Sequence, residues 1–143
     1  MKVFSPVKGT VFRVDQEWAG TKVEVQSERF PAFRFAIFHV KLGRPLKAGD
    51  SVNEGEYLGT HVDARTMSDI AVGVETPLGF KLVSWFEVLT DGAFAEYARR
   101  GMTSRSMAII SKEERDARPL ATTDRGFTTP DTPEDWVPLK PAR

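Results

Sequence analysis

The sequence predicts a mainly β fold, a small antiparallel β-sandwich of the barrel-hybrid kind, followed by one helix and an extended C-terminal arm. The first ninety residues contain several short segments in which apolar and polar residues alternate with the period of a strand. Glycine-containing turns separate these segments at short intervals, which is typical of all-β sandwiches and barrels. The end of the chain is different, because five of the nine prolines lie from Pro119 onward.

The first two expected strands form a hairpin. They are "GTVFRV" at residues 9–14 and "TKVEVQS" at residues 21–27, and "WAG" at residues 18–20 lies between them at hairpin distance. In the second segment Val23 and Val25 face one side, and the charged and amide side chains between them face the other. This alternation indicates a strand with one buried face.

Three further segments complete the expected sheet. "FRFAIFHV" at residues 33–40 is more apolar than the first two and is predicted to be central. "GDSVNEGEYLGTHV" at residues 49–62 follows, with regularly placed glycines. "SDIAVGVET" at residues 68–76 and "KLVSWFEVL" at residues 81–89 are the last expected strands.

One helix is well marked after the strands. Asp91 is the expected N-cap, "GAFAEYARR" follows, and Gly101 ends the helix. Ser111 and Glu114 have the spacing of a capping box and indicate a second, shorter helix.

We therefore expect three regions: a β-domain at 1–90, a helical extension packed on it at 91–118, and an extended proline-rich arm at 119–143. Proline removes a backbone donor and fixes φ, so the arm is not expected to form long regular elements. Trp136 is a candidate anchor for the arm, either on the domain or on a second copy. A homo-oligomer formed through the arm is thus one expectation.

Composition excludes several classes of protein. The 143 residues include 20 basic and 20 acidic side chains, so the formal net charge is zero and no nucleic-acid partner is expected. Cysteine is absent, which excludes disulfides and thiolate chemistry. No apolar run reaches the length of a membrane span, and no secretion signal is recognised. For a complete chain these features predict a cytoplasmic protein.

Four segments occur in a familiar order: "SPVKGTVFRV", "FAIFHV", "LKAGDSVNEGEYLGTHV" and "SDIAVGVE". They resemble the core of the peptidase M23 family, the bacterial LytM-like zinc endopeptidases that cut peptidoglycan cross-links. The resemblance covers residues 3–85 and is strongest at 46–59. Lipoyl and biotinyl carrier domains are more distantly similar in that stretch, and "IFHV" favours the M23 family.

The resemblance implies a zinc ion held by two histidines and an aspartate, and this chain departs from that pattern. No His-x-x-x-Asp motif precedes Pro6, and the strand expected to carry His-x-His reads Asp69-Ile70-Ala71. Only His39 stands at a histidine position of the family. The resemblance therefore implies a degenerate domain in which the usual zinc endopeptidase activity is not expected.

The candidate site residues follow from these departures. His39 is either a hydrogen-bonded residue of the sheet or, with Asp69, an acid–base pair in an inherited groove. His61, Asp63 and Phe38 are candidate binding residues. No cofactor is expected; the alternative is a divalent transition metal held by His39, His61 and Asp63.

Three functions remain open. The first is a non-catalytic M23-like domain that acts in binding or assembly, with a peptide, a glycan or a protein as partner. The second is an enzyme of hydrolase or lyase type that reuses the groove through His39 with His61 or Asp69. The third is a lipoyl-like carrier or adaptor, although the hairpin lacks the lysine that such carriers modify.

Overall fold

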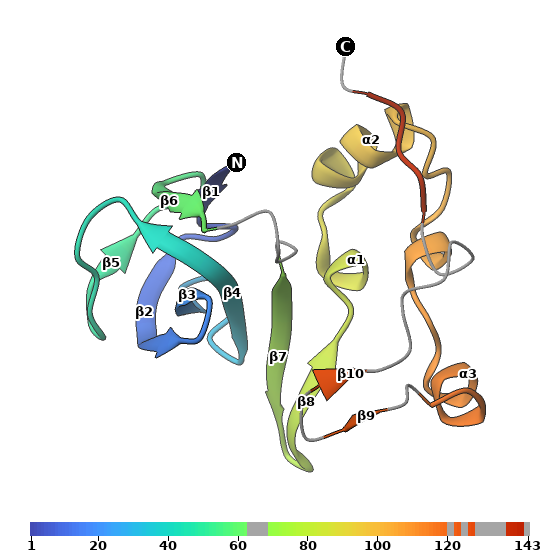
Figure 1. Cartoon of the computed structure of the whole chain (residues 1–143), viewed down its shortest axis with the longest axis horizontal. Coiled ribbons are helices and arrows are strands. Elements are labelled where there is room, and N and C mark those ends of the chain that lie inside the picture. The colour runs from blue at the N-terminus through green and yellow to red at the C-terminus, as the bar shows by residue number, and fades with distance from the viewer. Residues whose placement is uncertain (63–68, 120–121, 124–125, 128–136, 142–143) are drawn as a thin grey trace. The chain divides into compact units, whose positions relative to one another are not determined.

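The computed structural model describes residues 1–62, 69–119, 122–123, 126–127 and 137–141. The chain divides into two compact units, Met1–Trp85 and Phe86–Arg143 (Figure 1). The predicted division at residues 90 and 118 stays a prediction. Each unit is described below by itself.

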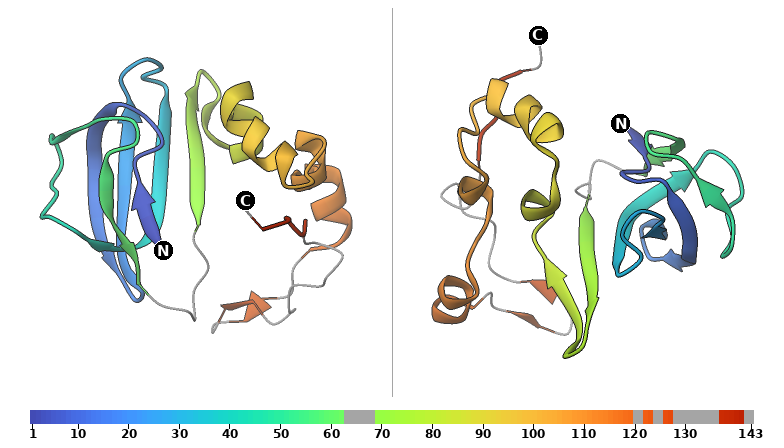
Figure 2. Two further views of the ribbon diagram at one scale, coloured as in Figure 1. Left: turned by 90° about the horizontal axis from the view of Figure 1, so that it is seen from above. Right: turned by 180° about the vertical axis from the view of Figure 1, so that it is seen from behind.

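The first unit is a single antiparallel sheet that curls on itself, which confirms the predicted β class (Figure 2). The hairpin predicted around Trp18 forms between the second and third strands. The strands are β1 Lys2–Phe4, β2 Gly9–Glu17, β3 Gly20–Ser27, β4 Phe33–Leu42, β5 Ser51–Val52, β6 Tyr57–His61, β7 Ile70–Thr76 and β8 Gly79–Val83.

β4 is the central strand, as its apolar sequence predicts. β3 pairs with one edge of β4 along most of its length. The other edge is shared: Phe33–Ile37 pair with β7, and Val40–Leu42 pair with β6. β4 thus changes its neighbour between Ile37 and Val40, and this change brings the ends of β6 and β7 to the same place.

The core of this unit lies on the inner face of the curled sheet. On β3, Val23 and Val25 are buried, and Lys22, Glu24 and Gln26 are only partly buried, as the alternation predicts. Burial of each such valine contributes on the order of 1.5–3 kcal/mol. The side chains most fully buried are Leu58, Val11, Val23, Val25, Val40, Val52 and Val72.

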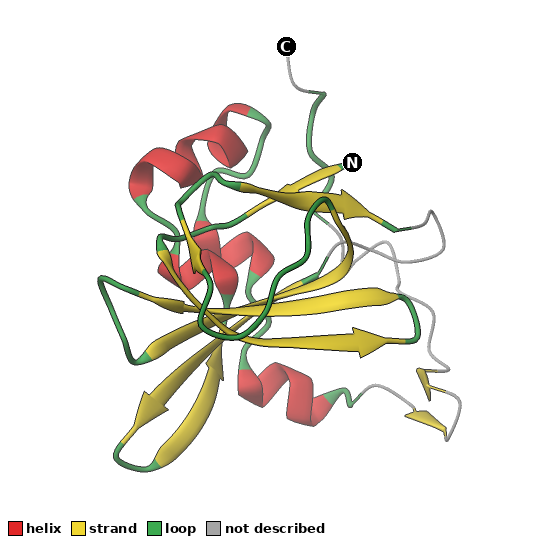
Figure 3. Cartoon of the chain, turned by 90° about the vertical axis from the view of Figure 1, so that its left-hand side faces the viewer, coloured by secondary structure: helices red, strands yellow, loops and turns green. Residues whose placement is uncertain are grey.

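The second unit contains short helices, drawn in red in Figure 3. α2 covers Asp91–Arg99, and its N-cap is Thr90, one residue before the expected Asp91, because the Thr90 side chain accepts from the backbone N–H of Ala93. The predicted capping residue Ser111 is confirmed, since it accepts from the N–H of Glu114. The other elements are the 3₁₀ helix η1 Arg105–Ala108, α3 Lys112–Ala117, β9 Thr122–Thr123 and β10 Gly126–Phe127.

The strand predicted over residues 81–89 is wrong in its second half. β8 ends at Val83, and Trp85–Val88 form the short helix α1. An apolar run of this length does not distinguish strand from helix by periodicity. Here the ring of Trp85 lies edge-on to that of Phe35, with the centroids 6.2 Å apart, so this partly buried residue packs against β4 of the first unit.

None of the helices that the structure describes is long and apolar enough to cross a membrane. This agrees with the absence of a long apolar run in the sequence.

Gly59 lies where three strands come close together, since β6 pairs with both β1 and β4. A Cβ atom at Gly59 would stand 2.1 Å from the carbonyl oxygen of Lys41. Backbone must therefore move to accept any side chain there. We expect Gly59→Ala to destabilise the protein by about 2 kcal/mol or more, measured by urea unfolding. Gly92→Ala is the control, because a Cβ at Gly92 meets open space, and an equal loss in both variants would contradict this account.

Candidate functional site

β4 contains a β-bulge at Phe38 and His39. Ile37 stands opposite Val23 and Val40 opposite Thr21, so the two residues between them on β4 face only one residue of β3. His39 has φ of 57°, and among the described residues it is the only one other than glycine with a positive φ. This backbone conformation costs a residue with a side chain about 1 kcal/mol or more.

Backbone hydrogen bonds fix both neighbouring strands at the bulge. The N–H of Phe38 donates to the carbonyl of Asp69 (3.1 Å), just before β7, and the N–H of Val62 donates to the carbonyl of His39 (3.0 Å), just after β6. At the bulge, therefore, the strand hydrogen-bonded to this edge of β4 changes from β7 to β6.

The His39 side chain is buried and both ring nitrogens face acceptors. Nδ1 lies 3.0 Å from the carbonyl oxygen of Ala19, and Nε2 lies 3.3 Å from Oδ2 of Asp69. A carbonyl oxygen can only accept, so Nδ1 carries a hydrogen. The contact with the Asp69 carboxylate is an ion pair when Nε2 also carries one.

Aromatic rings surround His39 on three sides. The centroid of its ring is 5.9 Å from that of Trp18, 6.1 Å from that of Phe38 and 6.3 Å from that of His61. Trp18 stands in the β2–β3 turn and is 85% exposed. We call Trp18, Phe38, His39, His61 and Asp69 the His39 cluster.

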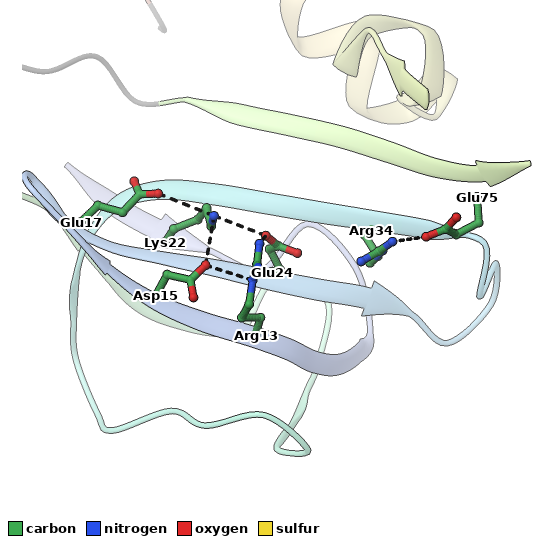
Figure 4. A network of polar contacts seen from close by, with 7 residues as sticks. All are labelled: Arg13, Asp15, Glu17, Lys22, Glu24, Arg34 and Glu75. Atoms are coloured by element: carbon green, nitrogen blue, oxygen red, sulfur yellow. Dashed lines mark hydrogen bonds and ion pairs between the residues drawn. The ribbon is translucent and has the colours of Figure 1, made fainter. Parts of the chain in front are cut away.

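A network of charged side chains lies beside this cluster on the outer face of β2 and β3 (Figure 4). The ammonium of Lys22 is 3.0 Å from Asp15, 3.4 Å from Glu24 and 3.6 Å from Glu17. It also lies 5.9 Å from the centroid of the Phe38 ring. The hydrogen bond to Asp15 is the main reason that the pKa of Lys22 is raised above its ordinary value.

Arg13 belongs to the same network. Its guanidinium lies 2.6 Å from Glu24 and 3.0 Å from Asp15. The hydrogen bond to Glu24 raises the pKa of Arg13 above its ordinary value. The polar surface next to the His39 cluster therefore carries alternating, mutually paired charges.

The structure brings together four of the residues singled out from the sequence: His39, Asp69, His61 and Phe38. Asp63 lies outside the described residues. The catalytic and binding roles assigned to these residues stay predictions. Trp18 was recognised in the sequence only as part of a turn; a tryptophan in a tight turn is the signal that could have identified it as a surface contact.

Within the part of the chain that the structure describes, no three histidine or carboxylate side chains lie together as a metal site would require. The proposed set of His39, His61 and Asp63 includes a residue outside that part. What the described residues show is that both nitrogens of His39 already face oxygen atoms of the chain.

No protein-family model, curated protein or solved structure matches this chain. The resemblance to the M23 family therefore remains a hypothesis that its motifs alone support.

The left-handed backbone of His39 leads to a test by substitution. In most strand positions glycine is less stable than alanine by roughly 0.5–1 kcal/mol. At residue 39 we expect the opposite order: His39→Gly should exceed His39→Ala in free energy of unfolding by about 1 kcal/mol, since glycine adopts positive φ without strain.

Urea unfolding measures both variants, and Lys41 is the matched control position. Lys41 is an exposed residue of the same strand, and Lys41→Ala should be more stable than Lys41→Gly. If alanine is the more stable residue at both positions, His39 is not held in the left-handed conformation.

Proposed function

We propose that this chain is a non-catalytic, M23-like binding module that contacts its ligand through the exposed side of the His39 cluster. One observation carries the proposal: both ring nitrogens of His39 face acceptors of the chain itself, while the neighbouring Trp18 is 85% exposed. The buried histidine thus has a structural role, and the exposed tryptophan is the group available to a ligand.

The environment of His39 supports this division of roles. A histidine that ligates a metal or accepts a proton needs a nitrogen lone pair directed at its partner. Here Nδ1 donates to the Ala19 carbonyl, which holds the β2–β3 turn, so only Nε2 can present a lone pair, and the Asp69 carboxylate, just before β7, stands 3.3 Å in front of it. The ring therefore connects two elements far apart in the sequence.

Trp18 has the properties of a ligand contact. Exposing a large indole to water is unfavourable, and tryptophan is among the residues that contribute most to binding energy when covered. Its ring lies edge-on to the buried His39 ring, with the centroids 5.9 Å apart, so the exposed indole stands directly beside that imidazole. The carboxylates of Glu17, next to Trp18 in the chain, and of Asp69, beside the His39 ring, are the polar partners for a peptide or a glycan.

A second function is favoured by one specific contact. The Asp69 carboxylate at 3.3 Å from Nε2 of His39 is the pairing that orients a histidine in many hydrolases. An enzyme of hydrolase or lyase type that uses His39 with Asp69 or His61 is therefore the alternative, and the experiment below separates the two.

The test is calorimetric titration of the full chain with soluble peptidoglycan fragments, the ligand class that the M23 resemblance suggests. We expect saturable binding that Trp18→Ala weakens by about tenfold or more. Phe30→Ala is the control. Phe30 is 56% exposed but stands in the turn at the opposite end of β3, and its loss should change affinity by less than about twofold.

Mass spectrometry of the fragments after incubation completes the test. Unchanged fragment masses are expected of a binding module. Cleaved fragments, absent with Asp69→Asn, would establish the enzyme instead. Absence of binding, or equal weakening by Trp18→Ala and Phe30→Ala, would overturn the proposed site.

A further inference from the structure

Trp18 offers a large aromatic face to a ligand of the His39 cluster. It stands in the β2–β3 turn, is 85% exposed and lies edge-on to the ring of His39. The face of an indole carries partial negative charge, so it attracts a cation placed over it. The charges around Trp18 therefore decide whether a neutral or a cationic ligand fits this face better.

The charged network on β2 and β3 has more carboxylates than cations. The carboxylates are those of Asp15, Glu17 and Glu24, and the cations that contact them are Lys22 and Arg13 (Figure 4). Three negative charges share two positive charges, so these five side chains carry one negative charge in excess. This local balance matters more than the charge of the whole chain, because salt screens charges that are more than about 10 Å away.

Glu17 is the carboxylate of this network that is least neutralised. Its contact with Lys22, at 3.6 Å, is the longest of the three that this ammonium makes with the network, and the hydrogen bond of Lys22 is made to Asp15. Among these side chains, Arg13 contacts the other two carboxylates. Because Glu17 directly precedes Trp18 in the chain, the excess negative charge lies next to the indole.

Asp69 adds a second carboxylate, beside the ring of His39. The Asp69 side chain is 57% exposed, and among the described residues His39 is the one within ion-pair distance of it. Nδ1 of His39 directs its hydrogen at the Ala19 carbonyl, so the neutral ring turns a lone pair, and no positive charge, toward Asp69. A neutral His39 therefore leaves the negative charge of Asp69 open to a ligand.

We propose that the ligand of the His39 cluster is a peptide with a cationic side chain, lysine or arginine, which lies against Trp18 while Glu17 and Asp69 supply the opposite charge. This inference rests on the proposed function and narrows its ligand to one class. The stem of a lysine is apolar and packs on an aromatic ring, and its ammonium extends beyond the ring to a carboxylate. A neutral glycan would cover the indole and leave both carboxylates without a partner of opposite charge.

Titration of the full chain with two short peptides, followed by NMR, tests this inference. The probes are Ac-Gly-Lys-Gly-NH₂ and the same peptide with norleucine, which keeps the four-carbon stem and lacks the ammonium. The indole N–H signal of Trp18 reports binding, and Trp18→Phe identifies it among the three tryptophans. We expect the lysine peptide to bind at least about fivefold more tightly than the norleucine peptide. Salt at about 0.5 M should reduce this preference by screening the charges.

Single substitutions locate the charges that produce the preference. Glu17→Gln and Asp69→Asn each remove one charge at nearly constant volume, and each should weaken binding of the lysine peptide by about twofold or more while the norleucine peptide binds as before. Glu28→Gln is the matched control. Glu28 is an exposed carboxylate paired with Lys8, just after the end of β3 that is far from Trp18, and its substitution should leave the preference unchanged. Melting temperatures should show that all three variants fold.

The inference is overturned if the lysine peptide does not bind, if the two peptides bind equally, or if the preference persists in both Glu17→Gln and Asp69→Asn. These results are distinct from a failure of the proposed function. A Trp18 signal that moves equally with both peptides would keep the binding site and exclude only its cationic ligand. Peptidoglycan fragments that do not bind, or that bind equally well to Trp18→Ala, would overturn the site itself.

Discussion

The first unit depends on one constraint, the β-bulge at Phe38 and His39. A regular strand offers each edge to one neighbour, whereas β4 pairs with β7 before the bulge and with β6 after it. The left-handed backbone of His39 makes this exchange possible. The His39 carbonyl then accepts from the N–H of Val62, just after β6, and the N–H of Phe38 donates to the carbonyl of Asp69, just before β7.

The same residue determines the chemistry of the site. Because the backbone turns at His39, its ring lies under the β2–β3 turn, where the Ala19 carbonyl and the Asp69 carboxylate occupy both nitrogens. Strained residues often occur at functional sites. Here the strained residue is His39, whose buried ring connects distant segments. The exposed side chain next to it is Trp18.

Sequence patterns predicted the parts of the fold that depend on alternation. Val23 and Val25 identified the buried face of β3, and the apolar character of residues 33–40 identified the central strand. The bulge was not predictable, because bulges with positive φ are usually marked by glycine and this one carries histidine. The helix in the second half of residues 81–89 was not predicted, because a continuous apolar run has no diagnostic period.

The candidate site shows the same limit. His39 and Asp69 were both singled out, but their 3.3 Å contact depends on the pairing of β4 with β7, which no local pattern contains. Trp18 was overlooked as a contact, since its exposure and its position against the His39 ring follow from how the turn folds back on the bulge. Local propensity specifies strands and turns; long-range pairing determines which side chains meet.

The most direct test of this account is the ¹⁵N NMR spectrum of the histidine side chains, recorded with increasing zinc. The chain has only two histidines, and His61→Gln assigns the signals. The account predicts a hydrogen on Nδ1 of His39 and ring signals that stay in place when zinc is added. An Nδ1 without hydrogen would contradict the hydrogen bond to Ala19. His39 signals that shift with stoichiometric zinc would contradict a structural role and establish His39 as a metal ligand.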